Sequence, residues 1–149
     1  MGRQLIYHEA RTSAAPAAVY ELLRDGASWP TWSPVGSFEL ERPGDEEKEG
    51  VGAIRVFRSD FPTGEVASRV QIAELVPDRR LGYRTLSGLP AVRDYRGEIE
   101  LEATDDGTVI RWRCSFLPTV PWTGRLARRL LGNFVEKCIK GLSEYAAAR

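Results

Sequence analysis

The sequence predicts an α+β fold in which a seven-stranded, curved antiparallel sheet wraps around one long C-terminal helix. Residues 35–117 alternate apolar and polar side chains with a period of two, in six segments separated by turn residues. Residues 121–148 instead repeat apolar side chains at three and four residue steps, which is the helical period. A strand and two short helices are expected before these segments. A chain of 149 residues can bury a core without disulfides or metals, so we expect one domain over residues 1–149.

The N-terminal part supplies the first strand, over residues 3–12, and the two short helices that follow it. In SAAPAAVYELLRD, Pro16 occupies the first turn of a helix that Gly26 ends. The next stretch, WPTWSP, predicts a short turn or broken helix interrupted by two prolines. Both helices therefore lie between the first and second strands.

The six later segments are expected to be strands at roughly 35–42, 51–59, 64–76, 80–87, 92–104 and 107–117. The step from Asp106 to Gly107 is the clearest hairpin signal, because this pair accepts the positive φ angles of a tight turn. With the N-terminal strand the sheet has seven strands, which we expect to follow one another as a meander. The C-terminal helix would be about 40 Å long at ~1.5 Å per residue, enough to cross the whole sheet.

Composition and charge exclude several classes of function. The chain is 42% hydrophobic and 28% charged, and its 21 basic residues balance 21 acidic ones, so no net field attracts nucleic acid. No segment approaches the ~18 apolar residues of a spanning helix, and the N-terminus lacks the apolar core of a signal peptide. We therefore expect a cytoplasmic protein. Cys114 and Cys138 lie in apolar patterns and are expected to be buried free thiols, with neither a metal site nor a cofactor predicted.

Four stretches resemble a known superfamily: SAAPAAVYELLRD with WPTWSP, EGVGAIRVF, VPDRRLGYR, and DGTVIRW before the last helix. In this order they resemble the START-like, or SRPBCC, helix-grip superfamily, and specifically its polyketide cyclase/dehydrase-type members. The resemblance covers essentially the whole chain. It implies a cavity between the sheet and the C-terminal helix that binds lipids, polyketides or other hydrophobic molecules. None of the four stretches is specific for a reaction.

Strand alternation predicts which side chains face this interior. Tyr95 shares a face with Ile99, Trp112 shares one with Phe116, and Tyr83 is expected to point inward on its own strand. Trp29 or Trp32 is expected at the mouth of the cavity. For each aromatic side chain taken alone, plain core packing is the alternative interpretation. The candidate ligand-binding residues are Trp29, Trp32, Arg55, Phe57, Tyr83, Tyr95, Trp112, Phe116 and Phe134.

Arg55 is the polar candidate for which the direction of the side chain matters most. It alternates with Ala53 and Phe57 and could face the interior, where a guanidinium needs a carboxylate, hydroxyl groups or an anionic ligand. The opposite alternation, in which Ile54 and Val56 face the interior and Arg55 faces solvent, fits nearly as well. Related sequences often place an acidic partner on the next strand, but GEVASRV there has Glu65 only near the turn. His8, the only histidine, has no identifiable nucleophile or paired carboxylate and is expected to be a structural or surface residue.

Charge is distributed unevenly along the chain. Residues 118–149 hold six basic and two acidic side chains, a local balance of +4, with Trp122 nearby. We expect a solvated helix face, and transient contact with an anionic membrane is the alternative. The loop GDEEKEG is expected to be a solvated turn.

The leading functional hypothesis is binding of a small hydrophobic molecule, lipid-like or polyketide-like, between the sheet and the C-terminal helix. The first alternative is an aromatase/cyclase-type enzyme that positions a reactive chain, with Arg55, Tyr83 or Tyr95 polarising a carbonyl. The second alternative is a regulatory module that binds a protein partner. No catalytic motif decides whether the protein is an enzyme, and neither the ligand nor the oligomeric state follows from the sequence.

Overall fold

The computed structural model describes residues 2–149. It contains one helical turn labelled η1, three α-helices and seven strands. Their bounds are β1 (Gln4–Thr12), α1 (Pro16–Arg24), η1 (Gly26–Ser28), α2 (Trp29–Trp32), β2 (Val35–Arg42), β3 (Ile54–Phe61), β4 (Gly64–Val76), β5 (Arg80–Ser87), β6 (Val92–Thr104), β7 (Gly107–Pro118) and α3 (Gly124–Ala148).

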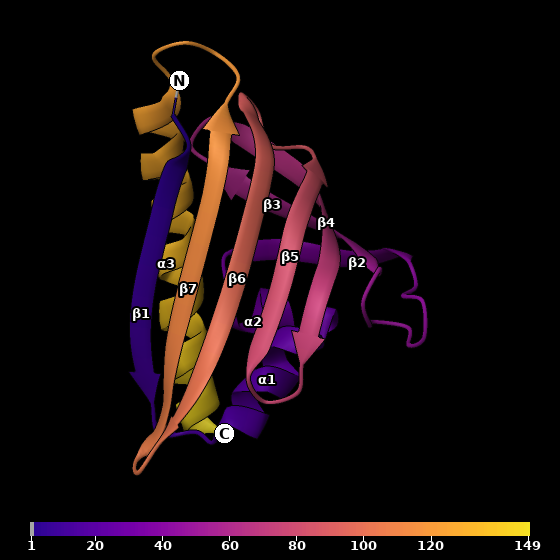
Figure 1. The fold of residues 1–149 in the computed structure, drawn as a ribbon, viewed down its shortest axis with the longest axis vertical. Coiled ribbons are helices and arrows are strands. Elements are labelled where there is room, and N and C mark those ends of the chain that lie inside the picture. The colour runs from indigo at the N-terminus through magenta and orange to yellow at the C-terminus, as the bar shows by residue number, and fades with distance from the viewer. Residues whose placement is uncertain (1) are drawn as a thin grey trace.

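The strands form one antiparallel sheet with the order β1-β7-β6-β5-β4-β3-β2 (Figure 1). The predicted α+β helix-grip fold is confirmed. The prediction of a seven-strand meander is wrong at one strand, because only β2 to β7 follow one another as neighbours. β1 instead pairs with β7, with Gln4 opposite Phe116 and Thr12 opposite Thr108. The segment with α1 and α2 carries the chain from this edge of the sheet to the other, which makes the separation of β1 from β2 sterically feasible.

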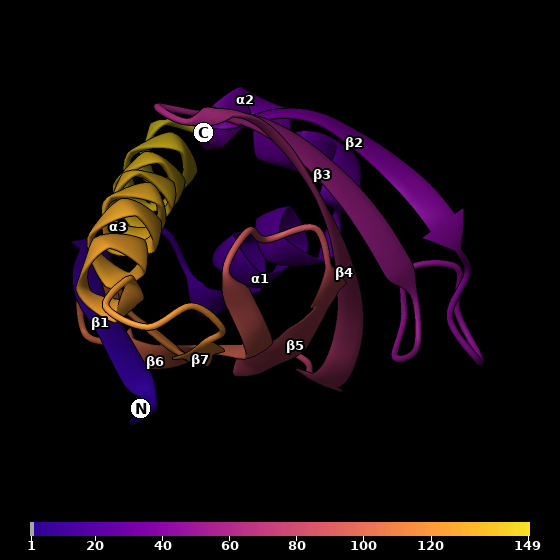
Figure 2. The same cartoon turned by 90° about the horizontal axis from the view of Figure 1, so that it is seen from above.

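The sheet curls strongly, and Figure 2 shows it arching from β1 through β5 to β2 around α1. The long helix α3 packs chiefly against β1, with fewer contacts to β7, α1 and α2. The helix therefore runs along one side of the arch and does not cross the whole sheet. Helices α1 and α2 close one end of the arch, at the bottom of Figure 1, and the β5–β6 and β7–α3 loops lie at the other end.

Most predicted boundaries agree with the structure, and β2, β4, β5 and β6 agree at both ends. The third strand begins at Ile54 instead of residue 51, because Val51 and Gly52 form a turn in which Gly52 has a φ of 92°. The last helix begins at Gly124 instead of residue 121. Trp122, with a φ of 69°, lies in the left-handed region and cannot continue a helix.

The core is formed by the inward faces of the sheet together with buried faces of the three helices. Both cysteines are free and buried, as predicted. Helix α3 approaches α2 closely at Gly141, where a Cβ atom would overlap the carbonyl oxygen of Trp32. His8 is partly exposed on β1, with Nδ1 3.9 Å from the Glu136 carboxylate. Within the part of the chain that the structure describes, no helix is both long and apolar enough to cross a bilayer.

Candidate ligand-binding cavity

A mostly apolar cavity of about 70 Å³ lies between the sheet and α3. Strands β3, β4 and β5 place alternate side chains in its wall, as the period of two dictates. Phe57, Ser68 and Tyr83 represent one strand each, and α3 contributes Phe134 and Val135. The lining also contains the hydroxyl groups of Ser59 and Thr85, so the cavity offers a few neutral polar groups within an apolar wall.

Tyr83 is the central polar group of the wall. Its hydroxyl oxygen accepts a hydrogen bond from Trp112 Nε1 at 3.1 Å and lies 3.5 Å from the sulfur of Cys114. Burial raises the pKa of Tyr83 well above its ordinary value, and burial does the same for the pKa of Tyr95. Both phenols are therefore protonated at neutral pH. Gly97 pairs with Tyr83 across β5 and β6, and a Cβ atom there would overlap the Tyr83 ring.

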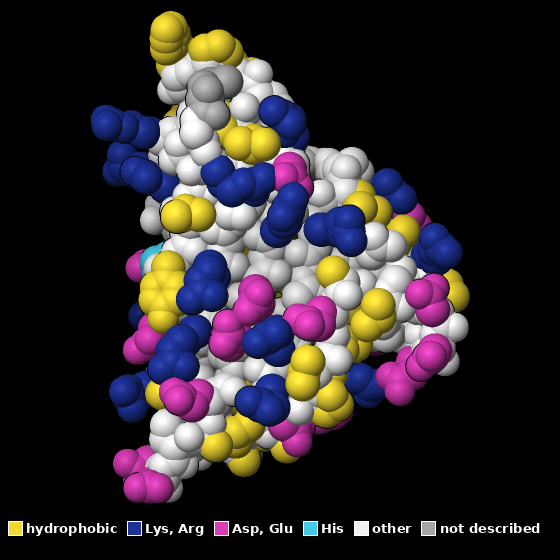
Figure 3. Space-filling model, in the orientation of Figure 1, with side chains coloured by type: hydrophobic (Ala, Val, Ile, Leu, Met, Phe, Trp, Pro, Cys, Tyr) yellow, Lys and Arg dark blue, Asp and Glu magenta, His cyan; other side chains and the backbone are white. Residues whose placement is uncertain are grey.

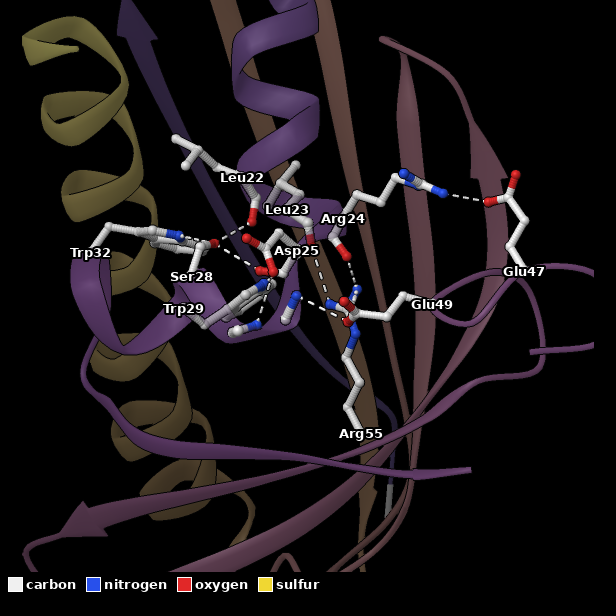
Figure 4. Close-up of polar contacts among 12 residues, drawn as sticks. Leu22, Leu23, Arg24, Asp25, Ser28, Trp29, Trp32, Glu47, Glu49 and Arg55 are labelled. Atoms are coloured by element: carbon white, nitrogen blue, oxygen red, sulfur yellow. Dashed lines mark hydrogen bonds and ion pairs between the residues drawn. The ribbon is translucent and has the colours of Figure 1, made fainter. Parts of the chain in front are cut away.

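Arg55 points inward, and its side chain is only 1% exposed. Its guanidinium group reaches the C-terminal end of α1, where Nη1 donates to the Leu23 carbonyl at 3.0 Å and Nη2 donates to the Arg24 carbonyl (Figure 4). The last carbonyls of a helix carry partial negative charge, so this position favours a cation. Burial nevertheless dominates and lowers the pKa of Arg55 to about 10, while Glu49 opposes the shift. The guanidinium is therefore still charged at neutral pH.

The carboxylate partner of Arg55 comes from the loop between β2 and β3. Glu49 Oε1 lies 3.3 Å from Arg55 Nη2 and accepts a hydrogen bond from the Gly26 backbone N–H at 3.0 Å (Figure 4). The prediction that GDEEKEG is a solvated turn is thus wrong at Glu49, whose side chain is 24% exposed. Strand β4, which follows β3, supplies no carboxylate to Arg55 within the described chain. Ser68 on this strand donates to the Phe57 carbonyl at 3.5 Å. Arg55 therefore ties β3 to α1. Of the three nitrogens of its guanidinium group, only Nε has no hydrogen-bond partner within the described chain.

The two tryptophans of α2 lie at the closed end of the arch. Trp29 lines the cavity, stacks on Phe57 at 5.0 Å between ring centroids, and donates from Nε1 to the Leu23 carbonyl at 3.1 Å. Trp32 packs behind it at 4.5 Å and does not line the cavity. The expectation that either tryptophan forms the mouth is wrong, because both are buried beside α1.

The remaining candidates from the sequence also include residues that line the cavity and one that does not. Arg55, Phe57, Tyr83, Tyr95, Trp112 and Phe134 are all part of the cavity lining. Phe116 is not, because it is fully buried behind Tyr95, with which it stacks at 6.0 Å. Seven of the nine candidates therefore reach the cavity when Trp29 is included.

The cavity adjoins a groove at the end of the arch opposite α2. This groove has a volume of about 330 Å³ and lies between the β3–β4 turn, the β5–β6 loop and the start of α3. Four side chains line both the groove and the cavity: Phe61, Val66, Leu89 and Leu131. The ring of Phe61 stacks on Phe134 at 5.1 Å and so bridges β3 and α3 at this boundary.

Sequence reasoning missed Phe61 and Leu89. Phe61 has the same parity as Arg55, Phe57 and Ser59, so an extension of β3 by two residues would have predicted it. Leu89 lies in a loop, where no periodicity indicates the direction of a side chain. Within residues 2–149 there is no group of three histidine, cysteine, aspartate or glutamate side chains that could hold a metal ion.

Comparison with known proteins assigns the chain to a family. The family model described as polyketide cyclase / dehydrase and lipid transport matches residues 4–147. No curated protein sequence matches the chain significantly.

Solved structures share the fold. A START superfamily protein from Mycobacterium smegmatis aligns with a TM-score of 0.83 at 11% identity, over 99% of each chain. The di-domain aromatase/cyclase StfQ of the steffimycin biosynthetic pathway aligns at 0.82 and 15% identity, over 99% of this chain and 51% of that one. The Zhui aromatase/cyclase from a Streptomyces species (R1128) aligns at 0.73 and 19% identity, over 99% and 93%. Because the family model spans nearly the whole sequence, this chain belongs to the polyketide cyclase / dehydrase and lipid transport family.

Proposed function

We propose that the protein binds a small, mostly apolar molecule, with one end in the cavity and the body in the groove. The observation that carries this proposal is that an inner apolar cavity and an outer, more open apolar groove adjoin each other and share four lining residues. The description of the family includes lipid transport, which supports a ligand of this class.

The dimensions favour an elongated ligand. Sites for drug-sized molecules have volumes of about 300–1,000 Å³. The cavity of about 70 Å³ accepts only the end of such a molecule, whereas the groove of about 330 Å³ accepts its body. A larger part of the ligand would enter the interior only if the Phe61–Phe134 pair separated, since these two rings lie between β3 and α3 at the boundary.

The polarity of the wall favours an uncharged buried end. Arg55 is the only charged side chain in the described lining, and its two terminal nitrogens are engaged by α1 carbonyls and Glu49. A carboxylate in the cavity would have to compete with these partners, and burial of an unpaired charge is costly. A hydroxyl or carbonyl oxygen, in contrast, can hydrogen bond with Tyr83 or Ser68.

The second candidate function is that of an aromatase/cyclase, for which the Tyr83 hydroxyl is the favouring observation. The Tyr83 hydroxyl lies 3.5 Å from the sulfur of Cys114, which is a weak hydrogen-bond acceptor, so a substrate carbonyl would be a better acceptor for its proton. With a raised pKa, Tyr83 is a hydrogen-bond donor and not a base at neutral pH. Two structural neighbours are named as aromatase/cyclases, but at under 20% identity they support the fold and not the reaction.

Native mass spectrometry of the purified protein tests the binding proposal. We expect one apolar molecule per chain to bind from a mixture of straight-chain alcohols, and to be retained better as the chain length increases. Failure of every apolar compound to bind would contradict the proposal. Turnover of a polyketide-like chain that is lost in Tyr83→Phe while apolar binding persists would favour the cyclase over a simple carrier.

A further inference from the structure

Exposed apolar side chains border the groove where β7 connects to α3. Trp122 is 87% exposed, Leu126 56% and Val120 46%. Trp122 also has a φ of 69°, a conformation that bulky residues rarely adopt and that is unfavourable without compensation. Leu126 lines the groove itself. A strained, solvent-exposed tryptophan gains nothing from the fold of the isolated chain, which indicates that it contacts something outside it.

The adjoining turns of α3 carry an uncompensated positive charge. Arg125, Arg128 and Arg129 are exposed, and residues 119–135 contain no acidic side chain. Within the described chain none of the three forms an ion pair. The first turns of a helix already carry positive partial charge, so arginine is unfavourable there. This part of the surface would therefore be stabilised by an anionic partner.

We call these three arginines, together with Val120, Trp122 and Leu126, the rim surface. In Figure 3 basic side chains predominate over the upper half of the molecule, with apolar side chains at the tip. The nearby carboxylate of Asp94 is neutralised by Arg3 and Arg96. Asp60 and Glu65 lie opposite each other on the β3–β4 hairpin, so any contact with an anionic partner is directed to the α3 side of the groove.

We propose that the rim surface docks the protein on an anionic lipid bilayer. Tryptophan is enriched at membrane–water interfaces, and basic side chains beside it contact lipid phosphates. A bilayer fits better than an acidic protein because the apolar side chains are exposed around a connecting loop, and a fluid lipid surface needs no matching shape. Because the groove opens beside this surface, an apolar molecule could pass between the cavity and the lipid phase without crossing water.

Vesicle binding tests the proposal with the full chain. Ligand-free protein is sedimented with vesicles of phosphatidylcholine alone or with roughly one-third phosphatidylglycerol. We expect binding only to the anionic vesicles, weakening as salt increases. Trp122 should be quenched by brominated lipid, whereas Trp29, Trp32 and Trp112 are buried and should not be. Because no cavity ligand is involved, this result is independent of the proposed function.

Matched variants distinguish binding through the rim surface from nonspecific attraction of basic residues to the anionic vesicle. A basic residue near an anionic surface contributes about fivefold in affinity, so Arg128→Gln with Arg129→Gln should weaken binding roughly 25-fold. The control pair, Arg11→Gln with Arg149→Gln, removes the same charge from the opposite end of the molecule and should change affinity less than about twofold. Trp122→Ala should abolish lipid quenching. Equal losses in both pairs, no binding to anionic vesicles, or binding only to an acidic protein would overturn the proposal.

Discussion

The buried ion pair between Arg55 and Glu49 gives the sharpest prediction about stability. Glu49→Gln preserves the size of the side chain and its acceptor for the Gly26 N–H, but it removes the counter-charge of Arg55. Breaking a fully buried pair costs about 3–5 kcal/mol. Arg55 is 1% and Glu49 24% exposed, so solvent screens part of this cost and we expect a loss of about 2–3 kcal/mol.

Urea and thermal unfolding measure this loss, which corresponds to a decrease of roughly 5–10 °C in Tm for a chain of this size. Glu47→Gln is the matched control in the same loop, because Glu47 pairs with Arg24 at the surface and its side chain is 61% exposed. It should cost no more than ~1 kcal/mol. In an Arg55→Met background, Glu49→Gln should lose most of its effect. Equal, small effects of the two glutamine substitutions would refute the assignment of Glu49 as the partner of Arg55.

Three further predictions concern packing, thiols and pH. Gly141→Ala should destabilise the protein by about 1–3 kcal/mol through overlap with α2, whereas Gly132→Ala, with open space around it, should stabilise it by up to ~1 kcal/mol in the same unfolding assay. Burial raises the pKa of the Cys114 and Cys138 thiols, so both cysteines should react with Ellman's reagent at pH 8 only after denaturation. Because the pKa values of Tyr83 and Tyr95 are raised by folding, stability should be fully present below pH ~10 and decrease above it.

The regular half of the site could be predicted from the sequence. In β5 and β7 one face is apolar and the other charged, so alternation alone placed Tyr83 and Trp112 inside. In β3 both faces are buried, since Ile54 and Val56 are as inaccessible as Phe57, and alternation could not decide the direction of Arg55. Periodicity identifies an inward face only where the opposite face is polar.

The remaining features of the site, namely the partners of Arg55 and the position of Trp29, depend on contacts between segments far apart in the chain. The partners of Arg55 are a carboxylate from a polar loop and carbonyls at the end of α1, and neither leaves a local pattern. Trp29 is one of the two tryptophans that the sequence predicts at the mouth of the cavity. Its position at the closed end follows from the packing of α2 against α3 near Gly141, which local sequence does not encode.

Binding of an apolar fluorescent probe, N-phenyl-1-naphthylamine, to a variant with a filled cavity tests the central claim most directly. Ser68→Phe places a ring in the cavity wall, and Ser37→Phe makes the same change on the exposed surface of β2. We expect saturable binding of one probe to the wild type and to Ser37→Phe, and at least about tenfold weaker binding to a folded Ser68→Phe variant. Equal affinity in all three proteins would show that apolar molecules bind elsewhere and would contradict binding in the cavity.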